Sequence, residues 1–280
     1  MALTDVLTLH RPLAFLDLET TGRDPARDRI IDLALVTVHP NGRNDEWVIR
    51  VDPGVPIPPD VSRVHGIVDQ DVRGRPPFAA YARTLAVLLA GCDLAGFNLL
   101  RFDLPLLEAE FQRCGLSFAR EGRALVDAMV IFHQREQLER RNLSAAVRHY
   151  CGQAHLYAHS ALEDVRATIA VLTAQLQRYP DLPRTVDQLH RLCQSRGTDY
   201  CDPEGKLRRR GGTIVLGFGK YFGVPLEEVA RQEPDYLRWI LSASFSEPVK
   251  AEVRAALAAT GEATELPPGG LFGKLTRWLR

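Results

Sequence analysis

The sequence predicts an α/β or α+β fold built on a mixed sheet, followed by a small second unit. Strand-like segments come first and amphipathic helical segments follow them, which favours a layered sheet-and-helix architecture. Asn41-Gly42 lies between two of the strands and is typical of a hairpin connection. The chain has 280 residues, and at about 150 residues per domain this length predicts two domains.

Short apolar segments rich in β-branched residues predict the strands. The first of them ends before Gly22, and a Pro-rich loop is expected at Asp52–Asp60. The predicted strands are Leu13–Thr20, Ile30–Val38, Glu46–Val51 and Asp93–Phe97.

Apolar residues at helical spacing predict the helices of the first domain. Ser160 and Glu163 have the spacing of a capping box, which marks the start of a helix that continues to Leu176. Tyr179-Pro180-Asp181 then closes the domain. The other helices are expected at Ala79–Ala90, Leu104–Arg113, Leu125–Phe132 and Leu143–Tyr150.

The C-terminal third divides into three further parts on composition. Residues 1–180 form the first domain, and residues 181–212 hold a short helix, Val186–Gln194, and a polar basic linker. Residues 213–259 form a small C-terminal α+β domain. The tail, 260–280, is rich in Gly and Pro, with a short helix expected in its last ten residues.

Charge and cysteine content exclude several classes of protein. Lys plus Arg number 35 and Asp plus Glu number 35, so bulk positive charge cannot coat nucleic acid and any such contact must be local. The five cysteines include no CxxC pair, which favours reduced thiols over a disulfide framework. No apolar stretch approaches the roughly 18 residues of a membrane span. A cytoplasmic protein without a membrane partner is expected.

Separated acidic residues suggest a metal site. Asp17 and Glu19 are two apart on a predicted strand, so both side chains point to one face. Two carboxylates on one face can hold a hard divalent cation, although two surface acids would give the same pattern. Asp103 precedes a helix, where an N-cap is the local prediction and a role at a crevice stays compatible with it.

His159 and Asp164 lie on either side of the helix start at Ser160, so both can face the same end of that helix. Divalent metals can stabilise the attacking and leaving oxygens of a phosphoryl displacement. A histidine with a near-neutral pKa can take the proton from the attacking water. The acids and the histidine therefore suggest metal-assisted phosphodiester hydrolysis, although structural roles for each residue alone remain open.

Four ordered motifs resemble those of the DEDDh exonucleases, the superfamily that includes proofreading subunits of bacterial replicative polymerases. The resemblance covers roughly residues 11–178 and departs from the usual second motif in two ways. Phe97 stands where His is common, and one extra residue lies between Asn98 and Phe102. The motifs are Phe15-Leu-Asp-Leu-Glu-Thr-Thr-Gly22, Pro56-Ile-Pro with Val64-His-Gly-Ile67, Gly96-Phe-Asn-Leu-Leu-Arg-Phe-Asp103 and His159-Ser-Ala-Leu-Glu-Asp164.

This resemblance implies an RNase H-like fold, a mixed five-stranded sheet flanked by helices. It implies two Mg²⁺ or Mn²⁺ ions held by Asp17, Glu19, Asp103 and Asp164, with His159 as the general base. Phe102 is expected near the terminal nucleotide, where core packing is an equal alternative, and His65 near the base. Further substrate contacts are expected from Leu18, Thr20 and Asn98.

The second domain resembles the small C-terminal domain of exonuclease X-type proteins. The resemblance rests on Leu216–Leu226 and Glu233–Ile240. The basic run Lys206–Arg210 precedes this domain. It is either a solvated linker or a contact for substrate phosphates through Arg208, Arg209 and Arg210.

The expected function is a 3′→5′ exonuclease that releases nucleoside 5′-monophosphates, in DNA repair or proofreading. Its partner would be a nucleic acid 3′ end, with single-stranded DNA favoured, and a replication or repair protein is a further candidate through the C-terminal domain. Two alternatives are an exoribonuclease that trims RNA 3′ ends and a non-catalytic nucleic-acid-binding adaptor with the same fold.

Overall fold

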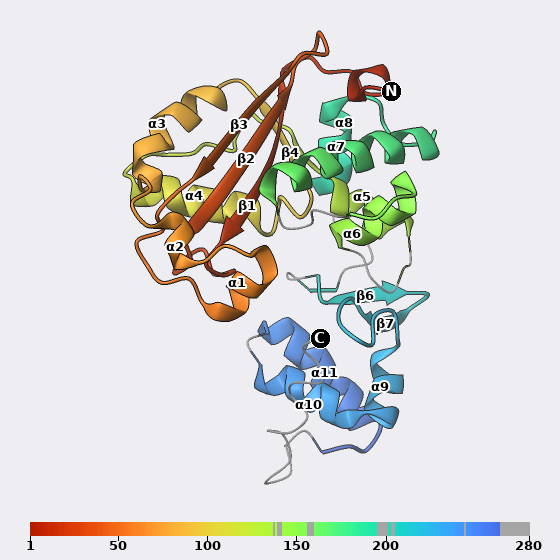
Figure 1. Cartoon of the computed structure of the whole chain (residues 1–280). Helices are drawn as coiled ribbons and strands as arrows, with labels where there is room; N and C mark the ends of the chain where they lie inside the picture. Colours follow the sequence, from red (N-terminus) through yellow and green to blue (C-terminus); the bar gives the residue numbers. More distant parts are fainter. Residues whose placement is uncertain are drawn as a thin grey trace. The chain divides into compact units, whose positions relative to one another are not determined.

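Five strands form one mixed sheet in the first of two units, Met1–Gln194 and Ser195–Arg280 (Figure 1). The computed structural model describes residues 1–136, 138, 142–155, 160–194, 201–202, 205–243 and 245–263. The sheet order is β3-β2-β1-β4-β5; the first three strands are antiparallel, and β4 is parallel to both β1 and β5. The strands are β1 (Leu13–Thr20), β2 (Ile30–Val38), β3 (Asn44–Arg50), β4 (Asp93–Gly96) and β5 (Leu125–Asp127).

Helices cover both faces of this sheet, which confirms the predicted mixed sheet flanked by helices. One core contains residues of α5, α7 and α8, and the other contains residues of α3 and α4. The helices are α1 (Pro59–His65), α2 (Asp69–Val72), α3 (Phe78–Leu88), α4 (Asp103–Arg113), α5 (Ala128–Arg135), α6 (Leu143–Ala146), α7 (Ala161–Arg178) and α8 (Val186–Gln194), with a 3-10 turn η1 (Leu3–Asp5) and a π-helical turn η2 (Val147–Cys151).

The alternation of side chains along β1 assigns its residues to the two cores. Leu13 and Phe15 pack on the face that α7 covers. Leu16 and Leu18 pack on the opposite face, with residues of α4. Because successive side chains alternate, Asp17 continues the face that is covered by α7. The strand therefore changes from apolar to acidic on that face alone.

Three local predictions are wrong in detail. Residues 125–127 form strand β5 rather than the start of a helix, because a short apolar run is compatible with either state. The predicted loop 52–60 overlaps α1, which begins at Pro59, a position where Pro is compatible with a helix. The capping box at Ser160 is not formed: the Ser160 side chain makes no capping hydrogen bond, and Glu163 pairs with Arg166 at 2.7 Å.

Helix α8 belongs to the first unit, although the sequence predicts that this domain closes at residue 180. The unit extends to Gln194, and Leu189 and Cys193 are buried in its core. The backbone N–H of Leu125 donates to Nδ1 of His190 at 2.9 Å, which attaches α8 to β5. Among the described residues, no helix is apolar over enough of its length to cross a bilayer.

The described residues of the second unit form a hairpin and three helices around a core of their own. Residues 207–210, predicted as linker, form strand β6 (Leu207–Arg210), which pairs antiparallel with β7 (Thr213–Leu216). Leu207 and Leu216 are fully buried, so the basic run is part of a folded element. The helices are α9 (Leu226–Gln232), α10 (Pro234–Ser242) and α11 (Glu247–Ala259). The predicted terminal helix lies outside the described residues.

Candidate active site

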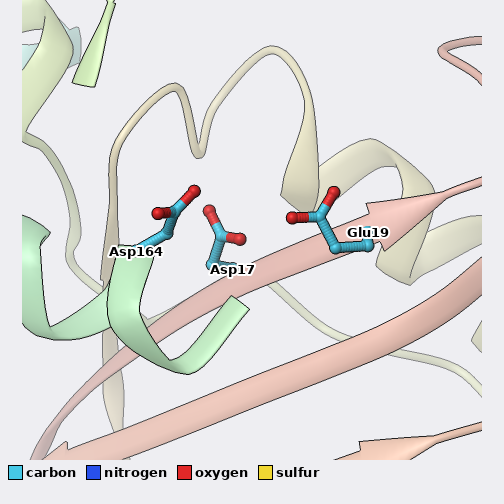
Figure 2. A group of neighbouring side chains, drawn as sticks. All are labelled: Asp17, Glu19 and Asp164. Carbon is cyan, nitrogen blue, oxygen red and sulfur yellow. The ribbon is translucent and has the colours of Figure 1, made fainter. Parts of the chain in front are cut away.

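Three carboxylates from two elements converge at the end of β1. One oxygen each of Asp17, Glu19 and Asp164 lies within 4.8 Å of the other two (Figure 2). Asp17 and Glu19 project from β1, and Asp164 projects from the first turn of α7. The β1–β2 register shifts between Glu19 and Thr20. Bulges are common beside active sites, where they redirect a side chain.

Asp103, the first residue of α4, lies beside the same part of β1. Its Oδ1 accepts a hydrogen bond from the backbone N–H of Leu18 at 3.1 Å, between the two acids of the strand. Helix α4 begins at Asp103 and its N-cap is Phe102, so the N-cap prediction for Asp103 is wrong. The side chain is buried and accepts from the neighbouring strand.

Burial and like charge raise the pKa values of these carboxyl groups. Desolvation is the largest cause for Glu19, followed by the charges of Asp164, Asp32 and Asp103, and together they raise its pKa to about 8. Desolvation, followed by the charges of Asp103 and Asp164, raises the pKa of Asp17. The pKa of Asp103 is raised by burial and then by the charge of Asp127. Each carboxyl group is therefore harder to ionise because the neighbouring carboxylates are negatively charged.

A divalent cation fits this donor set. The charged neighbours that act on Asp17 and Glu19 are all acidic, so bringing both to the ionised form requires a positive charge from outside the cluster. Carboxylate oxygens are the ligands that Mg²⁺ and Mn²⁺ prefer. The cluster Asp17, Glu19 and Asp164 can therefore hold a metal, with Asp103 close enough to act on their charge.

The predicted base, His159, lies outside the described residues. Another histidine, which no sequence motif marks, lies in the site. Nε2 of His155 is 3.1 Å from Oδ1 of Asp164, and both side chains are largely buried. His155 Nδ1 is 3.4 Å from the hydroxyl of Ser144, in the first turn of α6.

Asp127 is a second residue that sequence reasoning missed. It is 1% exposed and lies at the end of β5, next to β4. Because residues 125–132 are predicted as one helix, no strand end was expected at this acid. With β5 in place, Asp127 and Asp103 both follow adjacent parallel strands, and parallel strand ends are where α/β sites form.

The predicted substrate contacts of β1 have partners within the protein. The side chain of Leu18 is buried with the residues of α4, and only its backbone N–H faces Asp103. The hydroxyl of Thr20 donates to the carbonyl of Gly22 at 2.6 Å. These contacts shape the end of β1, and a direct substrate contact by either residue stays a prediction.

The other predicted substrate residues of the first unit lie on the loops around the sheet. His65 ends α1, and its Nδ1 accepts from the N–H of Ile67 at 3.0 Å, which leaves the ring proton on Nε2 when the ring is neutral. Asn98 has a left-handed backbone, φ 72°. Phe102 is partly buried against the core beneath α4. Their contacts with a nucleotide remain predictions.

The basic run is divided by the strand that carries it. Arg208 is 7% exposed and pairs with Val215 across the hairpin. Arg209 and Arg210 are exposed, and Arg209 Nη1 donates to the Gly212 carbonyl at 3.4 Å. Of the three arginines, these two are therefore the exposed ones.

The fold and the carboxylate cluster define a nuclease with a mixed sheet, and the sequence comparison agrees. Residues 14–172 match the model of the Exonuclease (RNase T) family, and the chain belongs to this family. Residues 216–243 match the Exodeoxyribonuclease X-like C-terminal family. Both matches confirm the resemblances on which the sequence prediction rests.

Two curated relatives are similar to the first unit. The chain is 28% identical over 180 residues to the DNA polymerase III subunit epsilon of Treponema pallidum, covering 62% of this chain and 81% of that protein. It is 28% identical over 185 residues to the 3′-5′ exonuclease DinG of Bacillus subtilis, covering 64% of this chain but only 19% of that protein.

Solved structures of exonuclease I share the fold. The enzyme from Methylocaldum szegediense matches with a TM-score of 0.52 and 25% identity, over 61% of this chain and 41% of that one. The E. coli enzyme in complex with a dT13 oligonucleotide matches with a TM-score of 0.57 and 19% identity, over 84% of this chain and 60% of that one. These matches confirm the RNase H-like exonuclease fold.

Proposed function

We propose that this chain is a metal-dependent 3′→5′ exonuclease that removes nucleoside 5′-monophosphates from the 3′ end of DNA. The observation that carries the proposal is the convergence of Asp17, Glu19 and Asp164 within 4.8 Å, with Asp103 beside them. The names of the relatives support the direction of digestion, since one is a 3′-5′ exonuclease and another a polymerase subunit.

The four acids would hold two Mg²⁺ or Mn²⁺ ions. When bound, these ions supply positive charge to the scissile phosphate and to its leaving oxygen. The protein holds the carboxylates together against their repulsion. Its sheet and α7 set the spacing of Asp17, Glu19 and Asp164, and the Leu18 N–H orients Asp103.

His159 is the proposed general base. It immediately precedes Ser160, the N-cap of α7, in whose first turn Asp164 lies. A general base contributes about 10²–10⁴-fold to a rate. We expect His159→Ala to reduce turnover by that factor while a pH dependence on the acidic side disappears.

Single-stranded DNA is the proposed substrate, and the second unit is proposed to bind the part of the strand beyond the active site. The solved exonuclease I structure contains a dT13 oligonucleotide, which supports a single-stranded substrate. Arg209 and Arg210 are exposed in β6 and can contact phosphates. A replication or repair protein as a further partner of this unit stays a prediction.

The test is a digestion of oligonucleotides that carry a label at the 5′ end, in Mg²⁺, Mn²⁺ or EDTA. Single-stranded DNA, duplex DNA with a 3′ mismatch and single-stranded RNA of the same sequence are compared. We expect a ladder that shortens from the 3′ end, release of 5′-mononucleotides, and no digestion in EDTA. Binding of long and short single strands is also compared for the double variant Arg209→Ser/Arg210→Ser. The double variant should bind only the long strands more weakly than the parent.

Other outcomes assign the alternatives. Faster digestion of the RNA strand makes the chain an exoribonuclease. Binding of the strand without release of nucleotides in either metal makes it a nucleic-acid-binding adaptor. Internal cleavage products would overturn the exonuclease proposal.

A further inference from the structure

Asp127 is a buried carboxylate to which the proposed reaction gives no role. It is the N-cap of α5, where Oδ1 accepts from the N–H of Met129 at 3.0 Å. A neutral Asn or Ser can make this contact equally well. The cap alone therefore does not explain why an acid is buried at this position.

The Asp127 carboxylate also accepts from the loop between β4 and α4. Oδ1 also accepts from the N–H of Asn98 at 2.9 Å, and Oδ2 accepts from the N–H of Leu100 at 3.2 Å. Two carboxylate oxygens thus accept from four backbone N–H groups, those of Asn98, Leu100, Met129 and Val130. Only a carboxylate accepts at both positions, because the amide of Asn would direct an N–H₂ group at one of the donors.

This loop has little freedom to move. Asn98 is the one residue other than Gly with a positive φ among those described, at 72°. Its carbonyl accepts from the N–H of Phe102 at 3.0 Å, and the Leu99 carbonyl accepts from that of Leu104 at 3.0 Å. The loop thus leads directly into the first turn of α4.

The loop also lies against β1. A Cβ at Gly96 would come within 3.0 Å of the Leu99 Cβ and 3.2 Å of the Leu16 carbonyl oxygen. Leu99 itself is fully buried. A small shift of the loop would therefore be transmitted to Asp103, whose carboxylate reaches the backbone of Leu18 on the same strand.

We propose that Asp127 is a positioning residue, which holds residues 98–100 so that the Asp103 carboxylate stays beside Asp17 and Glu19. The proposal rests on the proposed function for its kinetic readout. Asp127 itself does not contact the substrate or a metal. It acts on the reaction through Asp103, at the cost of a further buried negative charge near the site.

Asp127→Asn tests this role, because Asn keeps the helix cap and loses one of the two loop bonds. Partners of metal-site residues typically contribute about 10–100-fold to activity or metal affinity. We expect kcat on single-stranded DNA to fall by about that factor, with KM little changed. Asn142→Ala is the matched control, since Asn142 caps α6 through the Ala145 N–H and does not contact the loop; its kcat should match the parent.

A metal titration separates positioning from general stability. Mn²⁺ binding is followed by electron paramagnetic resonance in the parent, Asp127→Asn, Asp103→Asn and the double variant. Asp127→Asn should weaken Mn²⁺ binding in the parent and have no further effect once Asp103 is Asn. Equal weakening in both backgrounds, or an equal loss of kcat in Asn142→Ala, would overturn the proposal.

Asp127→Ser is measured in parallel, because a hydroxyl can cap α5 but cannot bond both loop donors. It should reproduce the kinetics of Asp127→Asn. If circular dichroism shows that neither variant folds, Asp127 is a stability residue and the proposal is wrong. If the parent has no nuclease activity, the proposed function fails, and the Mn²⁺ titration still reports whether Asp127 acts through Asp103.

Discussion

Glu19 and Glu110 are both buried glutamates of the first unit, and their surroundings are opposite. Glu110 accepts from Arg29 Nε at 2.7 Å, from Arg29 Nη2 at 3.2 Å and from the Ile30 N–H at 3.3 Å. Glu19 lies among acids, which together with burial raise its pKa to about 8. Burial of an acid is therefore not what marks a site here; the sign of its neighbours is.

The two glutamates therefore have different roles, one structural and one in the acidic cluster. The Arg29–Glu110 pair joins the start of β2 to α4 and leaves no charge for a ligand. The cluster at Glu19 keeps an uncompensated charge that an external cation can neutralise. Substitutions in the two regions should therefore affect different measurements.

The largest expected effect is on turnover in the acidic cluster. A metal contributes several kcal/mol to transition-state stabilisation, so Glu19→Gln or Asp17→Asn should lower the rate by about 10³-fold or more. Glu110→Gln is the matched control and should keep most of its activity, because Glu110 faces an arginine rather than the cluster. Near-normal rates for Glu19→Gln in Mg²⁺ would remove Glu19 from the metal ligands.

The next effect is on stability and should occur in the other region. Arg29→Met leaves Glu110 buried with less positive charge, and breaking a buried pair costs about 3–5 kcal/mol. We expect about 3 kcal/mol, at the low end of that range, because Arg113 Nη1 remains 3.3 Å from Glu110. Urea unfolding in EDTA measures this loss; a change below about 0.5 kcal/mol, the usual size of a surface substitution, would contradict it.

The smallest effect is a pH dependence of the metal-free protein. The folded pKa of Glu19, about 8, lies above its ordinary value of 4.5, so the folded chain binds this proton more tightly than the unfolded chain. The resulting stability is present below pH 4.5 and is lost as the pH rises towards 8. The stability of Glu19→Gln relative to the parent should therefore increase as the pH rises.

Unfolding of both proteins in EDTA at several pH values between 5 and 8.5 tests this dependence. At the upper end, Glu19→Gln should be more stable than the parent, whereas Glu110→Gln should be less stable, since it leaves Arg29 without its anion. A stability difference between Glu19→Gln and the parent that does not vary with pH would show that Glu19 is not strained by its neighbours.

The sequence predicted best those site residues whose placement depends on the local alternation of side chains. Asp17 and Glu19 are on one face of β1 because side chains alternate along a strand. Long-range partners followed only from the family resemblance, since no local pattern brings Asp164 to β1. Asp127 was missed because its strand has three residues and reads as the start of a helix.

The second unit shows the same limit. Arg208, Arg209 and Arg210 were predicted to lie in a polar, Gly-rich linker, either solvated or in contact with phosphates, but the hairpin they form depends on pairing with residues 213–216. Within the hairpin, Arg208 is buried and the next two arginines are exposed. A run of like residues therefore does not indicate which members of the run are accessible.

The opposite character of the two faces of β1 restricts how its length can change in evolution. A deletion of one residue between Leu13 and Asp17 would turn Asp17 and Glu19 towards α4 and Leu18 towards α7, since a shift of one residue reverses every side chain that follows. Loss of a residue pair would keep the faces but draw the acids about 7 Å towards the apolar core. The β2–β3 turn, with Gly42 exposed at its tip, has neither restriction. Length variation is therefore expected at that turn and not in the strand that carries the acids.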